Sequence, residues 1–223
     1  MPMLTMTRTV RGGKILFALA GACFFLMFNT VIAADAGKTM VYDIYHEKYG
    51  HIGLHRVSFK REGRDLIVDV NNDIVVKFFF VTAFHFQAHR REKWRDGKMI
   101  AYDSLTFDDG NRLLVKARTN GNALYVDRPS GRTSAPVGIF PSHPWNKEIL
   151  SQRLLLDSKT GELIHVQAHY AGKERIQAGG RWILANKYQI TGDETHDVWF
   201  DEVGNWVRLQ YRQNGQNVIF SLK

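Results

Sequence analysis

Short runs of alternating apolar and polar residues, separated by turn-forming residues, make up most of the chain after residue 40. Within Ile52–Arg61, His55, Val57 and Phe59 fall on one face, while Arg56 and Lys60 fall on the other. A period of two is typical of a strand with one buried face. The same criterion predicts strands at Met40–His46, Leu66–Val70, Met99–Phe107, Arg112–Thr119, Leu124–Asp127, Leu163–Tyr170, Arg175–Gln177, Trp182–Thr191, Asp197–Phe200, Trp206–Gln213 and Asn217–Leu222.

Asp or Asn followed by Gly recurs between these runs, at Asp96-Gly97, Asp109-Gly110, Asn120-Gly121 and Asn214-Gly215. These pairs tolerate the positive φ that tight hairpin turns require. Regular hairpin spacing favours an antiparallel meander, curved into a half-barrel or closed into a barrel. We therefore predict a mainly β domain with one short helix and a proline-rich lid loop.

The stretch from Ile74 to Trp94 is too long for one average strand of about 5–6 residues, yet it contains no Gly, Pro or Asn. We place the hairpin tip near Phe79, within the apolar cluster 78–81, and expect its rings to be buried against a neighbouring element. The alternative turn is Asn71-Asn72-Asp73, which would make the cluster mid-strand core. Even positions of this stretch are aromatic and odd positions polar or basic: Phe78, Phe80, Phe84 and Phe86 against His85, Gln87, His89, Arg91 and Lys93.

Pro129–Pro144 interrupts the strand pattern with four prolines and two glycines, which predicts a long irregular loop or lid. Asn146 can cap a short helix from Lys147 to about Leu156. The apolar run Leu154–Leu156 is too dense for a free surface, so we expect it to be buried.

The first 33 residues have the order of a secretory signal peptide: basic residues, then an apolar run, then small residues. Arg8, Arg11 and Lys14 precede an apolar run from 15 to 28, and a small-residue stretch ends at Ala33. We place cleavage after Ala33, giving a signal peptide at 1–33 and a single β-rich domain at 34–223 in the periplasm. An uncleaved anchor is the alternative, although a span needs about 20 apolar residues. Lipidation at Cys23 fits poorly, because Leu19 stands one place too far from the cysteine.

Removal of residues 1–33 would leave 27 Lys and Arg against 22 Asp and Glu, with no cysteine. The charge is spread along the chain, which argues against a nucleic-acid partner. Without disulfides, stability must come from the core. About 190 residues is enough to bury roughly 70% of the unfolded surface.

Three His-x-x-x-His pairs raise the question of a metal: His51/His55, His85/His89 and His165/His169. The last two pairs lie in predicted strands, where four residues span about 13 Å and cannot chelate one ion. No Gly-x-Ser-x-Gly elbow is present. An acid/base pair among Asp193, Glu194, His196 and Asp197 is conceivable, but polar residues beside a turn are the simpler interpretation. We expect no cofactor and no metal, and keep a metal-dependent hydrolase only as an unfavoured alternative.

Aromatic side chains give the remaining functional lead. In a flat sandwich they would form core, but in a half-barrel they could line a cavity for an acyl chain. We name Phe78, Phe80, Phe84, Phe86 and Trp145 as candidate ligand-binding residues. Phe79 and Val81 form the alternative, an apolar tip that contacts another envelope protein.

Three parts of the sequence carry a resemblance over nearly the whole mature chain. They are Val41-Tyr42-Asp43-Ile44-Tyr45 with Ile52-Gly53-Leu54-His55-Arg56-Val57, the turn 94–98, and Val198-Trp199-Phe200-Asp201 with Gly204-Asn205-Trp206-Val207. The chain resembles an uncharacterised family of exported bacterial proteins. That family is loosely similar to the half-barrel lipoprotein carriers of the Gram-negative periplasm. The resemblance implies no catalytic residues. The sequence therefore favours an exported, non-catalytic protein that binds an apolar or lipid-like ligand in a curved sheet.

Overall fold

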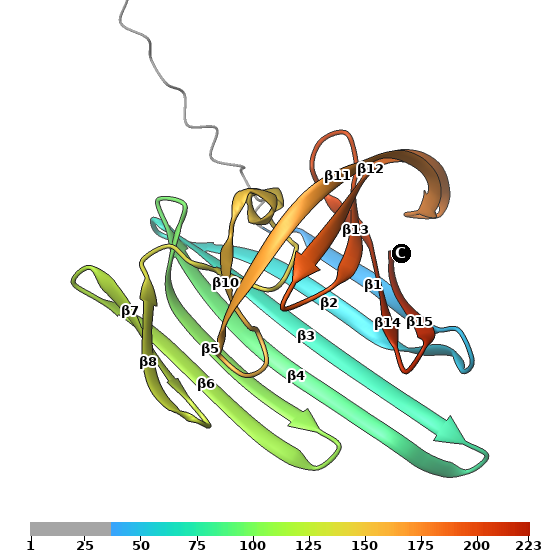
Figure 1. Cartoon of the computed structure of the whole chain (residues 1–223), viewed down its shortest axis with the longest axis horizontal. Helices are drawn as coiled ribbons and strands as arrows, with labels where there is room; N and C mark the ends of the chain where they lie inside the picture. The colour runs from blue at the N-terminus through green and yellow to red at the C-terminus, as the bar shows by residue number, and fades with distance from the viewer. Residues whose placement is uncertain (1–36) are drawn as a thin grey trace, which may run out of the picture. The chain divides into compact units, whose positions relative to one another are not determined.

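A single ladder of strands accounts for nearly all of residues 37–223, the part of the chain that the computed structural model describes (Figure 1). These residues belong to one compact unit. The predicted mainly β, antiparallel fold is confirmed. Its elements are β1 (Thr39–His46), β2 (Gly50–Glu62), β3 (Asp65–Phe78), β4 (Val81–Arg95), β5 (Lys98–Asp108), β6 (Asn111–Asn120), β7 (Ala123–Arg128), β8 (Gly131–Pro136), β9 (Phe140–Pro141), the 3₁₀ helix η1 (Lys147–Ser151), β10 (Leu154–Leu156), β11 (Leu163–Ala178), β12 (Arg181–Gly192), β13 (His196–Phe200), β14 (Trp206–Gln213) and β15 (Gln216–Leu222).

The sheet runs in the order β8-β7-β6-β5-β4-β3-β2-β1-β15-β14-β13-β12-β11-β10-β9, and it does not close. Neighbouring strands are antiparallel except β9 and β10, which are parallel. The sheet is curved, so that β11–β13 lie in front of β2–β4 in Figure 1. We call the face that turns toward the core the inner face.

Several hairpin turns form where Asp or Asn precedes Gly. Asp96 and Gly97 have φ of 50° and 74°, and Asn214 and Gly215 have φ of 51° and 79°. These angles match the two-residue turns whose twist suits antiparallel strands. The turn chemistry of the sequence thus sets the register of these hairpins.

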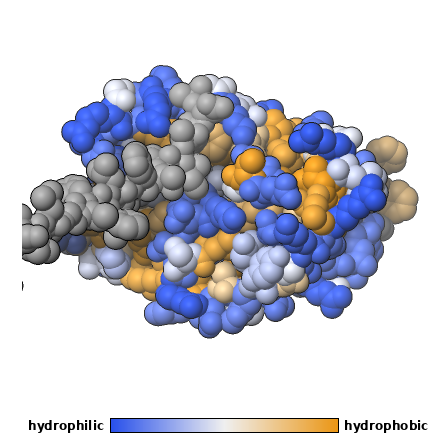
Figure 2. Space-filling view, turned by 90° about the horizontal axis from the view of Figure 1, so that it is seen from above, coloured by the Kyte–Doolittle hydropathy of each residue, from blue (hydrophilic) through white to orange (hydrophobic). Residues whose placement is uncertain are grey.

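The tip of the β3–β4 hairpin lies at Phe79-Phe80, as predicted, and Asn71–Asp73 continues β3 instead of turning. Phe79 has φ of 54°, which is uncommon for a bulky residue. The expectation that these rings are buried is wrong, because Phe79, Phe80 and Val81 are 82%, 102% and 69% exposed. The hairpin extends past its neighbouring strands, so no element reaches its end, and hydrophobic side chains protrude at this end of the molecule in Figure 2. The side chain of Phe78 lies outside the described residues.

The main core lies on the inner face, where Tyr42, Val57 and Trp206 are almost fully buried. The rings of Tyr42 and Trp206 stack with centroids 4.0 Å apart, and the Tyr42 hydroxyl donates to the Trp206 carbonyl oxygen at 2.9 Å. This contact joins β1 to β14 across the curve of the sheet.

The proline-rich segment differs from the prediction. The residues from Gly131 to Pro136 form the edge strand β8, paired with β7, because Pro136 stands at the strand end, where its missing N–H costs no ladder bond. The predicted helix shrinks to η1, five residues capped by the Asn146 side chain, which accepts from the Glu148 N–H at 3.0 Å. Leu154–Leu156 pairs with β11 as a strand instead, and Leu155 and Leu156 are buried as expected.

After β9 the chain crosses the inner face, and the loop 157–162 folds against β4–β7. The carbonyl oxygen of Ser158 accepts from Tyr102 Oη at 2.6 Å and from Ser104 Oγ at 3.1 Å. This loop fills part of the interior and sets the floor of the site described below. Among residues 37–223, no helix has the length and apolar character needed to span a bilayer.

Candidate ligand cavity

Two adjoining hollows lie on the inner face, one of about 670 Å³ and one of about 380 Å³. We call them the outer hollow and the inner hollow. Both have volumes within the range of about 300–1,000 Å³ that is typical of small-molecule sites. They are neighbours because five residues line both: Asn72, Phe86, Lys159, Tyr211 and Phe220.

Apolar side chains from three parts of the sheet line the outer hollow. Its walls include Ile74 and Val76 from β3, Phe84 and Phe86 from β4, and Phe220 from β15. Positions of equal parity on a strand face the same side, which explains why the even positions of β3 and β4 meet here. Polar side chains, among them Asp108, Lys159 and Gln213, line the same hollow, so its surface is mixed and its apolar part lies on β3, β4 and β15.

Two of the predicted ligand-binding residues, Phe84 and Phe86, therefore line the cavity. Phe80 does not, because it stands at the exposed hairpin tip. Trp145 lies on the inner side but packs in the core, with its ring centroid 5.4 Å from Phe59 and 5.5 Å from Trp94. Phe79 and Val81 lie at the tip, away from both hollows.

The inner hollow holds several charged and polar side chains among apolar ones such as Trp206, Leu209 and Phe220. Arg90, at an inward position of β4, is 6% exposed and donates from Nε to the Ser158 carbonyl oxygen at 3.1 Å. Lys159 forms an ion pair with Asp108. Lys159 lines both hollows and Asp108 the outer one, whereas Arg90 lines the inner hollow alone.

A histidine pair closes one side of the inner hollow. The Nε2 atoms of His55 and His143 lie 2.8 Å apart, and His55 Nδ1 is hydrogen-bonded to Asn72 Oδ1. Burial lowers the pKa of His55 to about 3, against the opposing effect of the Asn72 hydrogen bond and with a further lowering by the charge of Arg90. Burial also lowers the pKa of His143 well below its ordinary value, helped by His55 and Arg90. Both rings are therefore neutral at pH 7.

The tautomers follow from this chain of contacts. If the Asn72 oxygen accepts, His55 Nδ1 carries the proton, and His55 Nε2 accepts from His143 Nε2–H. His143 Nδ1 is then a bare acceptor, and it is buried with no hydrogen-bond partner in residues 37–223. Nothing in this arrangement activates a nucleophile: among the described residues, no serine hydroxyl is hydrogen-bonded to a histidine.

Glu92 lies behind the cavity, fully buried, two residues along β4 from Arg90. The indole Nε1 atoms of Trp94 and Trp145 each donate to its Oε2 at 2.8 Å. Burial raises the pKa of Glu92 to about 7, although the two indole hydrogen bonds and the charge of Arg90 act in the opposite direction. Glu92 therefore fixes Trp145 on the inner face and changes its charge near neutral pH.

Asp157 and Glu194 face each other at the rim of the inner hollow. Burial raises the pKa of Glu194 to about 7, with further contributions from the charge of Asp157 and a hydrogen bond to it. Burial lowers the pKa of the neighbouring His196 to about 4. Of the residues considered from sequence as an acid/base pair, Glu194 and His196 line the hollow, while Asp197 forms an ion pair with Lys187 at 2.8 Å.

The His-x-x-x-His pairs all lie on strands and none converges. His51 is exposed while His55 is buried on the inner face, and His85 and His89 both point outward, toward Asp73 and Asn71. Within residues 37–223, no three His, Cys, Asp or Glu side chains gather closely enough to hold a metal ion.

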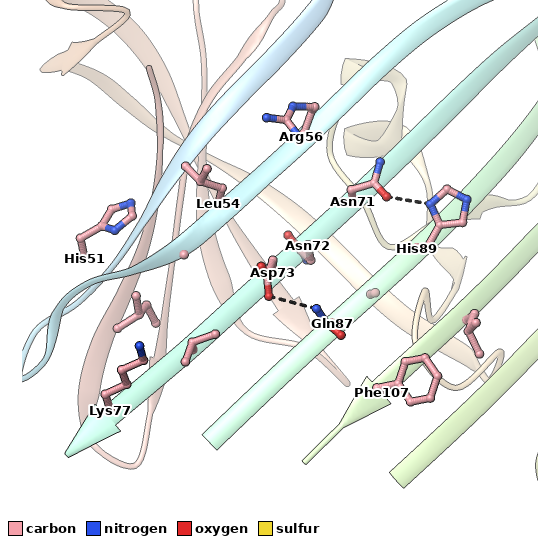
Figure 3. A pocket seen from close by; sticks show the side chains of 15 residues that line it. His51, Leu54, Arg56, Asn71, Asn72, Asp73, Lys77, Gln87, His89 and Phe107 are labelled. Carbon is pink, nitrogen blue, oxygen red and sulfur yellow. Dashed lines mark hydrogen bonds between the residues drawn. The ribbon is translucent and has the colours of Figure 1, made fainter. Parts of the chain in front are cut away.

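A separate hollow of about 740 Å³ lies on the opposite face of β2–β5, lined mainly by odd positions of β3 and β4 (Figure 3). We call it the polar groove. His89 Nδ1 and Asn71 Oδ1 lie 2.7 Å apart, and Gln87 Nε2 donates to Asp73 Oδ1 at 3.5 Å. These two pairs occupy part of its polar lining, to which Arg56 and Lys77 also belong.

The inner hollow was not predicted from sequence. Its only local signal is parity, because Arg90 and Glu92 stand at even positions of β4 in line with Phe84 and Phe86. Two charged residues on the apolar face of a strand indicate that charged side chains are buried in the interior at this point. His143, Ser158 and Glu194 come from segments whose approach to β4 no local pattern shows.

A comparison with solved structures supports a β-barrel-like fold. A crystal structure titled a β-barrel-like protein of domain of unknown function DUF1849, from Brucella abortus, aligns with a TM-score of 0.58 and 9% identity, covering 83% of this chain and 94% of that one. Curated proteins give no match. A family model described as a domain of unknown function, DUF6134, matches residues 42–223. The chain therefore belongs to the DUF6134 family.

Proposed function

We propose that the protein binds an apolar, lipid-like ligand in the cavity on the inner face and does no chemistry on it. The observation that carries this proposal is the pair of adjoining hollows, of about 670 and 380 Å³, whose walls include apolar side chains of β3, β4, β14 and β15. Burying apolar ligand surface there gains roughly 25 cal/mol per Å². The neutral histidine pair and the absence of a metal-binding group in residues 37–223 give no support to the hydrolase alternative.

The proposed place of action is the periplasm. The support is the order of charge, apolar run and small residues in 1–33, with cleavage near Ala33. An uncleaved anchor is the competing possibility. Edman sequencing of protein purified from a periplasmic extract separates the two, because cleavage gives Ala34 as the first residue.

Lipid binding is tested by blocking the cavity. Ala83 is exposed and lines the outer hollow, whereas the adjacent Thr82 is exposed and lines neither hollow. Ala83→Trp should cut the affinity for a fluorescent fatty acid at least tenfold, while Thr82→Trp leaves it unchanged. Both substitutions are at exposed sites, so both variants should keep the thermal midpoint of the parent.

Native mass spectrometry of the protein from periplasmic extracts provides an independent measurement. We expect an adduct that dissociates on denaturation and is identified as a lipid after extraction. If the extracts give no adduct and the parent protein binds no fatty acid, the proposal is contradicted.

A second function is favoured by the exposed rings at the β3–β4 tip, which could contact another envelope protein. Phe80→Asp should then abolish crosslinking to that protein in intact cells, with no change in thermal midpoint because the ring is fully exposed. Equal crosslinking by parent and variant would exclude the tip as the contact.

A further inference from the structure

The binding of an apolar chain does not explain why the positively charged Arg90 lies in the interior. Its guanidinium lines the inner hollow, and its Nε is held by the Ser158 carbonyl oxygen. Its terminal Nη atoms make no hydrogen bond to residues 37–223, and no carboxylate in this range lies within 4 Å of them. These Nη atoms are not among the enclosed polar atoms that lack a partner, so they reach the hollow, where an anionic group could pair with them.

The other charged groups around the inner hollow are already compensated. Lys159 pairs with Asp108. The Asp157 carboxylate accepts from the Lys159 and Thr160 N–H groups at 3.0 and 2.5 Å, and it faces Glu194, whose pKa burial raises to about 7. His55 and His143 are neutral, and Glu92 directs its carboxyl to two indoles. Among the described residues that line this hollow, Arg90 is therefore the cation without an ion pair, although the carboxyl groups of Asp157 and Glu194 line the same hollow.

The position of Arg90 indicates where the charged group and the apolar chain of a fitting ligand would lie. The two hollows adjoin, with the guanidinium in one and apolar walls in the other. A guanidinium suits a planar or tetrahedral oxyanion, which can accept two parallel N–H bonds. A group bound at Arg90 would leave an attached chain to run along Phe86 toward Phe84 and Val76.

We propose that the ligand is an anionic amphiphile, with a carboxylate or phosphate head on the Arg90 guanidinium and an alkyl chain in the outer hollow. The inference rests on the proposed lipid-binding function and adds the chemistry of the head group. Ser158 positions the arginine through Nε and leaves both Nη atoms for the head group.

The test compares three twelve-carbon ligands by isothermal titration calorimetry: dodecanoate, dodecyl phosphate and dodecan-1-ol. Hydrogen bonds to charged groups contribute about 1.5–3 kcal/mol, so the parent should bind at least one anion about 10- to 100-fold more tightly than the alcohol. The ranking of the two anions identifies the head group. This comparison needs no variant and holds even if a substitution at Arg90 impairs folding.

Arg90→Gln should remove the preference for the anions and leave the affinity for the alcohol unchanged, and Arg90→Lys should retain part of the preference. The matched control is Arg91→Gln, on the outward side of the same strand, which should behave like the parent. Without ligand, Arg90→Gln should unfold at the same temperature as the parent or higher, because it removes a buried charge. A purely structural Arg90 would give a lower midpoint and an unchanged preference.

The outcomes separate the two proposals. If none of the three ligands binds the parent, the proposed lipid-binding function fails. If the alcohol binds as tightly as both anions, or Arg90→Gln keeps the preference, lipid binding stands and the head-group inference is overturned.

Discussion

Glu92→Gln should make the protein more stable above neutral pH. The Glu92 carboxyl is fully buried, and its pKa is about 7 in the folded protein against an ordinary value of 4.5. At low pH both folded and unfolded chains carry the proton. As pH rises from about 4.5 to about 7, the unfolded chain releases the proton while the folded chain keeps it, so stability falls with increasing pH.

The size of this effect follows from the shift in pKa. At about 1.36 kcal/mol per pKa unit, a shift from 4.5 to about 7 corresponds to roughly 3 kcal/mol. Glutamine stays neutral at every pH and keeps an oxygen that can accept from Trp94 and Trp145. We expect the variant and the parent to differ by less than about 1 kcal/mol at pH 4.5, and the variant to be more stable by up to about 3 kcal/mol at pH 8.

Urea unfolding followed by tryptophan fluorescence at pH 4.5, 6 and 8 measures this difference. Glu194 also has a raised pKa, but it contributes equally to both proteins and cancels in the comparison. Glu202→Gln, at an exposed turn position, controls for the loss of a carboxyl. A difference between variant and parent that does not change with pH would refute the reasoning.

Two further predictions concern the sheet itself. Arg95 donates to both oxygens of Asp65 at 2.6 and 2.9 Å, and together with Lys93 it holds the pKa of Asp65 well below its usual range. The resulting stability is present above the ordinary carboxyl pKa and lost as pH falls through the folded value, so Asp65→Asn should flatten the acid limb of the stability curve below pH 4. An unchanged acid limb in a pH titration of the urea midpoint would contradict this. Gly53→Ala would place its Cβ 2.0 Å from the Asp73 carbonyl oxygen, so it should cost more than about 2 kcal/mol. Gly63→Ala, with open space around its Cβ but a φ of 62°, should cost only about 1 kcal/mol in the same urea assay.

Local chemistry was sufficient to predict most of the sheet. Alternation located the strands, and the Asp-Gly and Asn-Gly pairs located their turns, because both depend on residues close in sequence. The tip at Phe79 was found by exclusion, since no turn former was available. The burial of its rings was predicted wrongly because the relative lengths of neighbouring strands decide what covers a tip.

The inner hollow could not be predicted in the same way. Phe84 and Phe86 were identified from parity on one strand. Arg90 becomes informative only when the loop at Ser158 and the segment at His143 are folded onto the inner face; the Arg90–Ser158 contact spans 68 residues and the His55–His143 contact spans 88. Leu154–Leu156 illustrates the same limit, because pairing with β11 overrides a helical pattern.

The pairing of β1 with β15 has a consequence for how the chain can be cut and rejoined. It is the one neighbouring pair in the ladder of residues 37–223 whose strands are not consecutive in sequence, and the Lys223 N–H donates to the Val41 carbonyl oxygen at 2.9 Å. A short linker could therefore join residue 223 to residue 37, with new ends opened at 137–139, between the two edge strands. In such a circular permutant every strand would pair only with its neighbours in sequence, and lower contact order favours faster folding.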